Sequence, residues 1–148
     1  MTMDFDTTVK LAIYRTTAET GAPPSAAAVS TRLEVEAGAV KEAYARLRTR
    51  RMLLLNPGGE TILMAPPFSG VPTQHRVTIG SLSYYANCAW DALGIPAALH
   101  RPGLVESECA ESHEPLRLSV GLDGPEPSSW LFHCLVPANR WWDDLVFT

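Results

Sequence analysis

The chain has 148 residues, of which 46% are apolar and 19% charged, and its formal net charge is −4. A chain of this length buries roughly 68–70% of the surface that its unfolded form exposes, so it can build one core or two small adjoining cores without disulfides. The composition excludes a disordered or fibrous protein. The negative net charge disfavours a protein whose main task is to bind nucleic acid, because that affinity comes chiefly from clustered lysine and arginine.

The N-terminus and the cysteines bear on the cellular location. Residues 1–6 are acidic and contain no basic and apolar leader, and no stretch approaches the roughly 18 apolar residues of a membrane span. The three cysteines, Cys88, Cys109 and Cys134, form no Cys-x-x-Cys pair. Their odd number and irregular spacing suit individual thiols in a reducing compartment better than a disulfide framework or a structural zinc site. We therefore expect a cytoplasmic protein with no membrane partner.

The first 65 residues predict three short helices and a β-hairpin. Apolar side chains recur near helical spacing in three segments, which cover residues 7–20, 25–33 and 36–47. Two apolar stretches then flank the turn sequence Asn56-Pro57-Gly58-Gly59. Three helices followed by a hairpin are typical of a winged helix, so we interpret residues 1–65 as a winged-helix-like domain.

Prolines and glycines in residues 66–75 predict a linker, and residues 76–148 follow as a second domain. Its pattern predicts strands at 76–79, 116–120 and 130–136, the last of them buried, and a helix over 84–93 that ends near Gly94 and Pro96. The expected fold class is α+β. In it, the winged-helix-like domain packs on a small mixed or antiparallel β-sheet with flanking helices, and the helix of Cys88 lies at the edge of the sheet.

Cys88 and Asp91 are the residues that carry the candidate chemistry. Their spacing within the predicted helix places both side chains on one face, within reach of a common ligand. A thiolate is a nucleophile and a soft-metal ligand, and a carboxylate can take or give a proton. Because a negative neighbour raises the pKa of a thiol, the pair makes most sense if Asp91 carries a proton or if an incoming cation displaces the thiol proton. An inert packed cysteine is the alternative interpretation.

The run YANCAWDALGIPAAL, residues 85–99, closely resembles the signature of the alkylmercury (organomercurial) lyase family, in which a Cys-Ala-x-Asp core is followed by leucine and then Pro-Ala. Further segments resemble that family in the same order, at residues 67–73, 107–109 and 136–144. The resemblance implies that Cys88 is the catalytic cysteine and Asp91 the catalytic aspartate of a detoxification enzyme. Such an enzyme binds R–Hg⁺ through thiolates and protonates the carbon, so the implied products are a hydrocarbon and Hg²⁺. No organic cofactor is implied.

The chain departs from the family at one point. The family's lyases use a second catalytic cysteine, which by the resemblance falls at Thr148 or directly after it. Two thiolates are the sensible requirement, because two-coordinate sulfur ligation polarises the Hg–C bond and holds the product ion. Three explanations stay open: the chain is truncated before that cysteine, Cys134 takes its place, or the pocket serves another task. The candidate mercury ligands are therefore Cys88, Asp91 and Cys134, whereas Cys109 resembles a structural position.

Two other functions fit the same residues. In the first, Cys88 is a nucleophile and Asp91 an acid or base that act on a non-mercurial small-molecule substrate. In the second, the winged-helix-like domain is a DNA-binding or metal-sensing regulator whose recognition helix, residues 36–50, contacts phosphates through the arginines between Arg46 and Arg51. A solvated helix end is the simpler interpretation of these arginines. The histidines lack ligand spacing and are interpreted as structural or surface residues, at His75, His100, His113 and His133.

Overall fold

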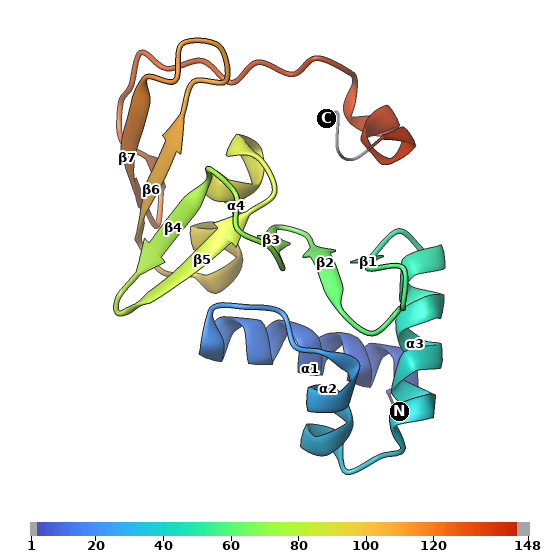
Figure 1. Cartoon of the computed structure of the whole chain (residues 1–148). Helices are drawn as coiled ribbons and strands as arrows, with labels where there is room; N and C mark the ends of the chain where they lie inside the picture. Colours follow the sequence, from blue (N-terminus) through green and yellow to red (C-terminus); the bar gives the residue numbers. More distant parts are fainter. Residues whose placement is uncertain (1–2, 145–148) are drawn as a thin grey trace.

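The computed structural model of the chain describes residues 3–144. It has three helices at the start of the chain and a fourth in the middle, namely α1 (Phe5–Thr20), α2 (Ala26–Leu33), α3 (Ala37–Thr49) and α4 (Ala89–Leu99). Figure 1 shows the first three helices gathered at one side of the molecule and α4 beside the strands at the other. None of the helices within residues 3–144 is long and apolar enough to cross a membrane.

Local capping explains where the first helices begin and end. The Asp4 carboxylate accepts a hydrogen bond from the Thr7 N–H at 3.1 Å, and the Ser25 hydroxyl accepts one from the Ala28 N–H at 3.2 Å. Gly21 ends α1 with φ at 90°, a left-handed conformation that glycine adopts without strain. The three predicted helices are confirmed to within a few residues. They share one core with the hairpin, and its fully buried side chains include Val9, Ile13, Val29, Val40, Tyr44, Leu47, Leu53 and Ile62.

The strands form a single antiparallel sheet of eight, in the order β1-β2-β3-β5-β4-β6-β7-β8. Their bounds are β1 (Leu54–Leu55), β2 (Ile62–Ala65), β3 (Phe68–Ser69), β4 (Arg76–Ile79), β5 (Leu82–Ala86), β6 (Gly103–Glu108), β7 (Pro115–Gly121) and β8 (Gly124–Pro125). The α+β fold class, the hairpin and the strands predicted at 76–79 and 116–120 are confirmed. Strand β6 was not predicted, because only Val105 of its residues is buried and its apolar alternation is weak.

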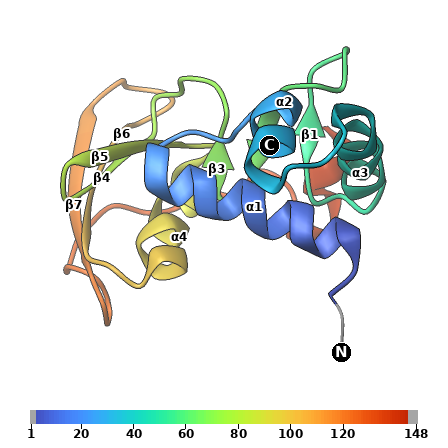
Figure 2. The same cartoon turned by 90° about the horizontal axis from the view of Figure 1, so that it is seen from below.

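The segment expected to be a linker carries strand β3, which pairs with β2 on one side and β5 on the other. Phe68 of this strand is 2% exposed and packs between two aromatic rings, with ring centroids 6.2 Å from Tyr14 and 5.6 Å from Tyr84. The Tyr84 hydroxyl in turn donates to the Ala18 carbonyl at 2.7 Å. Residues 66–75 therefore join the hairpin to the rest of the sheet. Figure 2 shows α1 running below β3 toward α4.

Helix α4 packs against β4, β5, β6 and β7, so it covers a face of the sheet. The expectation that it lies at the edge of the sheet was wrong. The second core lies between them and includes Val77, Ile79, Tyr84, Ala86, Ala92, Ile95, Val105 and Val120. The prediction of a helix over 84–93 was wrong in its bounds, because residues 82–86 form β5 and the helix continues through Gly94 and Pro96. Burial of Ile95 and Pro96 against the sheet compensates for the hydrogen bond that a proline cannot donate.

The chain after β8 runs in irregular conformation to a short 3₁₀ helix, η1 (Ala138–Asp143). The buried strand predicted for residues 130–136 was wrong, since Leu131 is 90% exposed and Leu135 is 63% exposed. Apolar composition alone suggested burial, but this segment pairs with no strand in the described part of the chain. In Figure 1 it crosses from the side of β7 to the side of β1 and α3.

Candidate active site

Cys88 lies at the N-terminus of α4, where the chain leaves β5 after Ala86 and turns into the helix. It is the N-cap residue, with extended dihedrals of φ −152° and ψ 177°, and its sulfur accepts a hydrogen bond from the Asp91 N–H at 3.5 Å. The expectation that both side chains share one face of a helix is therefore corrected. The thiol and Asp91 are close because the cap folds back on the first turn of α4.

The Asp91 carboxylate is half-buried and accepts a hydrogen bond from Asn87 Nδ2 at 2.9 Å. Asn87 directly precedes Cys88, so one short stretch supplies an amide, a thiol and a carboxyl group. The other amide atom, Asn87 Oδ1, is buried and has no hydrogen-bond partner among residues 3–144. Sequence analysis missed Asn87. Its spacing of four residues from Asp91 is the signal that would have indicated the contact.

The protonation of the two groups follows from their surroundings. Burial is the largest cause that raises the pKa of the Cys88 thiol, and the negative charge of Asp91 raises it further, against the hydrogen bond from the Asp91 N–H. Burial also raises the pKa of Asp91, while the hydrogen bond from Asn87 lowers it. The Cys88 thiol is thus protonated at neutral pH. This agrees with the inference from the sequence that Asp91 does not activate it.

The other two cysteines differ in their surroundings. Cys134 is exposed, and its thiol donates to the Val136 carbonyl at 2.8 Å. A thiolate at this position would be close enough to raise the pKa of Cys88 slightly. Cys109 lies at the turn between β6 and β7, where hydrogen bonds from Ser112 lower the pKa of its thiol. All three cysteines are free. Within residues 3–144 no group of three or more His, Cys, Asp or Glu side chains is placed to hold a metal ion, so Cys88, Asp91 and Cys134 do not form such a cluster.

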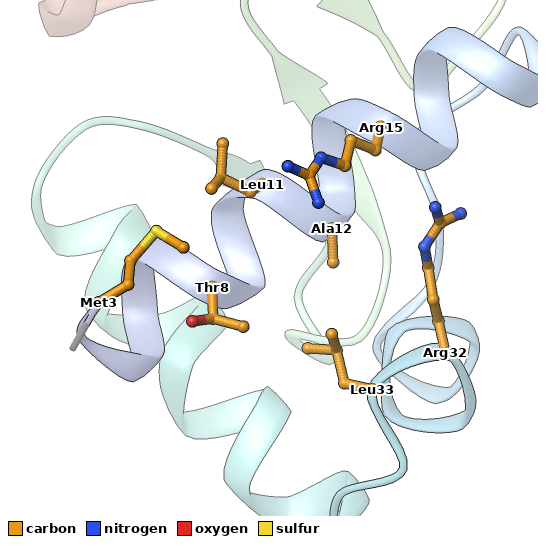
Figure 3. Close-up of a pocket in the computed structure, with 7 residues that line it drawn as sticks. All are labelled: Met3, Thr8, Leu11, Ala12, Arg15, Arg32 and Leu33. Atoms are coloured by element: carbon orange, nitrogen blue, oxygen red, sulfur yellow. The ribbon is translucent and has the colours of Figure 1, made fainter.

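Two cavities lie apart from the Cys88 thiol. A groove of about 510 Å³ runs between α4 and the β7–β8 turn, and its lining is mostly apolar, with Trp90, Leu93, Ala97, His100, Val120 and Leu122 among its residues. A smaller pocket of about 80 Å³ lies between α1 and α2, and Arg15 and Arg32 are among the residues that line it (Figure 3). Neither lining includes Cys88 or Asp91. Only Trp90 belongs both to the groove and to the first turn of α4.

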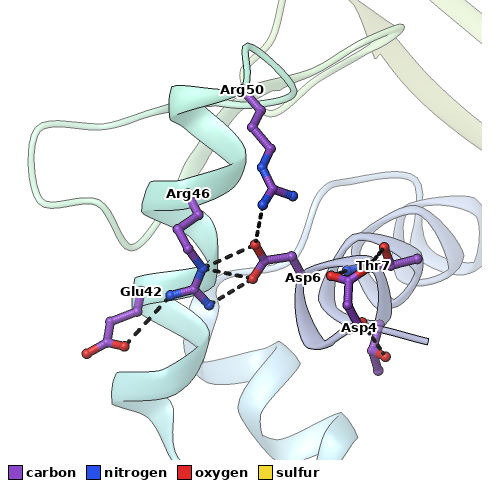
Figure 4. A network of polar contacts seen from close by, with 7 residues as sticks. Asp4, Asp6, Thr7, Glu42, Arg46 and Arg50 are labelled. Atoms are coloured by element: carbon purple, nitrogen blue, oxygen red, sulfur yellow. Dashed lines mark hydrogen bonds and ion pairs between the residues drawn. The ribbon is translucent and has the colours of Figure 1, made fainter. Parts of the chain in front are cut away.

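The arginines at the end of α3 are partly neutralised within the molecule. Arg46 donates from Nε and Nη2 to the buried Asp6 carboxylate at 2.8–3.1 Å, and Arg50 lies 3.4 Å from the same carboxylate (Figure 4). Glu42 lies 3.8 Å from Arg46 on its other side. These ion pairs hold α1 against α3. They leave less positive charge for the phosphates that the DNA-binding alternative requires.

His75 has a hydrogen-bond partner in a partly buried position. Its Nδ1 lies 2.7 Å from the Ser107 hydroxyl oxygen, and burial lowers the pKa of its imidazole, so the ring is neutral at pH 7. The His75 carbonyl accepts from the Ala86 N–H at 2.9 Å, and the Thr73 hydroxyl donates to the Ala86 carbonyl at 2.6 Å. This network fixes the end of β5, the strand that leads into Asn87 and Cys88.

The fold and the site together define an α+β protein that presents a thiol and a carboxyl group at the N-terminus of a helix. The family model described as alkylmercury lyase matches residues 68–148, more than half of the chain and the part that contains this site. The chain belongs to the alkylmercury lyase family.

Individual relatives agree with this assignment. Alkylmercury lyases of Bacillus cereus and Clostridium butyricum are each 37% identical over 70 residues, a match that covers 45% of this chain and 32% of theirs. The crystal structure of the mercury-bound form of MerB2 has a similar fold, with a TM-score of 0.62 and 21% identity over 81% of this chain and 59% of that one. The chain thus spans about a third of the length of the two lyases.

Proposed function

We propose that this protein cleaves carbon–mercury bonds by protonolysis, with Cys88 as the sulfur that binds the organomercurial and Asp91 as the proton carrier. The observation that carries the proposal is the contact at the N-terminus of α4, where the Cys88 sulfur and the Asp91 backbone share a hydrogen bond. This contact falls inside the segment that the family model matches.

The raised pKa of Cys88 fits a substrate that brings its own positive charge. When R–Hg⁺ binds the sulfur, the S–Hg bond forms and the thiol proton leaves, and the Asp91 carboxylate is the nearby base that takes it. The same proton then passes from Asp91 to the carbon. The electron pair of the C–Hg bond forms the C–H bond, the hydrocarbon departs, and Hg²⁺ stays on sulfur while Asp91 returns to the carboxylate.

Cys134 is the proposed second sulfur ligand. Mercury favours two sulfur ligands, and a thiolate at Cys134 would be close enough to Cys88 to act on its pKa. Its exposure and its weak partner, the Val136 carbonyl, leave the thiol free to turn toward a bound metal. The position that resembles the family's second catalytic cysteine, at or after Thr148, lies outside the described residues.

The test is hydrocarbon release from phenylmercury in excess small thiol, measured by gas chromatography. We expect release by the wild-type chain and none by Cys88→Ser or Asp91→Ala, with Hg²⁺ binding by Asp91→Ala still measurable. Cys109→Ser is the matched control and should keep wild-type release, because Cys109 follows β6 and has no role in the proposed reaction. No release by the wild-type chain would overturn the proposal. Equal loss of release and Hg²⁺ binding in Asp91→Ala would make the aspartate structural.

Turnover of a mercury-free substrate would instead favour the alternative reaction. A panel of thioesters and activated esters, assayed with the same variants, would detect a Cys88 nucleophile that acts without mercury. Under the protonolysis proposal, these compounds are not turned over at a rate that depends on Cys88.

A further inference from the structure

The position of Asp91 in α4 offers its carboxylate two hydrogen-bond donors. With Cys88 as N-cap, Asp91 is the third residue of the helix, the position from which a carboxylate commonly reaches back to the backbone N–H of the N-cap residue. Half of that capping arrangement is present, since the Cys88 sulfur accepts from the Asp91 N–H. The other half, a hydrogen bond from the Cys88 N–H to the Asp91 carboxylate, is not among the hydrogen bonds of the described residues. The carboxylate takes its hydrogen bond from the side chain of Asn87.

Asn87 is poorly placed for stability alone. Its Oδ1 is buried without a hydrogen-bond partner in the described chain. Such an atom destabilises the folded state, and an apolar side chain of the same size would avoid that loss. A polar residue held at an unfavourable position beside reactive groups is the usual sign of a functional constraint. The hydrogen bond to Asp91 is the contact that the amide gains in return.

The backbone that carries Asn87 is firmly held. Ala86, the residue before it, is hydrogen-bonded through both its N–H and its carbonyl to the segment from Thr73 to His75. Asn87 itself is half-buried. The amide therefore projects from a fixed point, and the 2.9 Å bond to Asp91 restrains the carboxylate.

We infer that Asn87 is a positioning residue, which holds the Asp91 carboxyl group beside the Cys88 sulfur and keeps it from folding back onto the helix N-terminus. The inference rests on the proposed function, because it explains how the proton carrier is held near the atom to which it must transfer a proton. In the absence of the amide, the carboxylate is expected to complete the capping arrangement. The helix would then be as stable as before, but the proton carrier would be misplaced.

The test compares Asn87→Leu, which removes the donor at similar volume, with Asn87→Gln, which keeps an amide. Asn139→Leu is the matched control, because Asn139 is exposed in η1. We expect Asn87→Leu to lower kcat for phenylmercury roughly 10- to 100-fold with KM changed less than about twofold, since misplaced catalytic groups affect the reacting step. Its urea midpoint should equal or exceed that of the wild type. Asn87→Gln should recover part of kcat, and Asn139→Leu should match the wild type.

A wild-type kcat in Asn87→Leu would overturn the inference, and so would a loss of kcat that merely follows a loss of folded protein. If the wild-type chain releases no hydrocarbon, the proposed function fails and a second measurement decides the role of Asn87. This is the carbon-13 chemical shift of the Asp91 side-chain carboxyl group. A change in Asn87→Leu that is absent in Asn139→Leu supports positioning, and an unchanged signal contradicts it.

Discussion

The rings of Trp90 and Phe132 lie with their centroids 5.7 Å apart, and this contact ties the irregular C-terminal segment to helix α4. Trp90 is two residues after Cys88, and Phe132 is two residues before Cys134. The pair therefore links the two parts of the chain that carry the candidate sulfur ligands. An aromatic contact between half-exposed rings is weak by itself, so its removal should loosen the segment without unfolding the protein.

Replacing Phe132 by Ala should weaken joint binding of Hg²⁺ by Cys88 and Cys134. A ring contact worth about 0.5–1.5 kcal/mol corresponds to a loss of affinity of roughly three- to tenfold. The measurement is protection of both thiols from alkylation during a titration with Hg²⁺. Leu131→Ala is the control, because Leu131 is 90% exposed beside Phe132. An equal effect of both variants would show that the ring contact does not hold the segment.

Cys88 and Cys109 should differ in their reactivity toward iodoacetamide. At pH 7 we expect Cys109 to react several-fold faster than Cys88, because hydrogen bonds from Ser112 lower the pKa of Cys109 while burial raises that of Cys88. The difference should shrink as the pH rises through the raised pKa of Cys88, where its thiolate also forms. Peptide mass spectrometry over a range of pH measures both rates. In urea the rates should converge, and a difference that persists there would contradict a structural origin.

Asp6→Asn should lower the free energy of unfolding at neutral pH by about 1 kcal/mol, a modest value because Arg46 and Arg50 are half-exposed and can be solvated. The hydrogen bonds from Arg46 are the largest cause that lowers the pKa of Asp6 below its ordinary 3.8. This stabilisation is therefore fully present above pH 3.8 and is lost as the pH falls through the lowered pKa. Urea unfolding at pH 7 and at about pH 2 measures it. A difference between the two proteins that stays constant across this range would refute the ion-pair explanation.

Replacement of Gly70 and of Gly94 by alanine should change the stability of the protein in opposite directions. A Cβ at Gly70 would lie 1.9 Å from the Ile62 carbonyl oxygen, so Gly70→Ala must move the backbone between β2 and β3 and should cost about 1–3 kcal/mol or more. A Cβ at Gly94 would meet Pro67 at an ordinary 3.6 Å, so Gly94→Ala in α4 should stabilise the protein by up to about 1 kcal/mol. Thermal unfolding compares the two. Destabilisation by Gly94→Ala would mean that α4 is packed more tightly there than the structure indicates.

Much of the first half could be predicted because its signals are local. Ser25 caps α2, Glu36 precedes α3, and the turn from Asn56 to Gly59 joins two apolar strands, each within a few residues of its partners. Such signals act before the chain has packed, so they survive in the folded protein. Strand β6 and the continuation of α4 through Pro96 depend instead on the surface against which each of them packs. The residues of these two elements do not by themselves specify that surface.

For the candidate site, the sequence by itself determined that Cys88 and Asp91 are neighbours, since three residues of chain cannot separate them far in any turn or helix start. The N-cap at Cys88 and the contact between Asn87 and Asp91 are also local, although the sequence analysis did not predict them. Tertiary structure alone decided that Phe132 brings the Cys134 segment to α4. The physical reason is how far apart the contacting residues lie along the chain. Short spacing limits distance through covalent geometry, whereas contacts between residues 40 apart form only when the packing of the whole chain places them together.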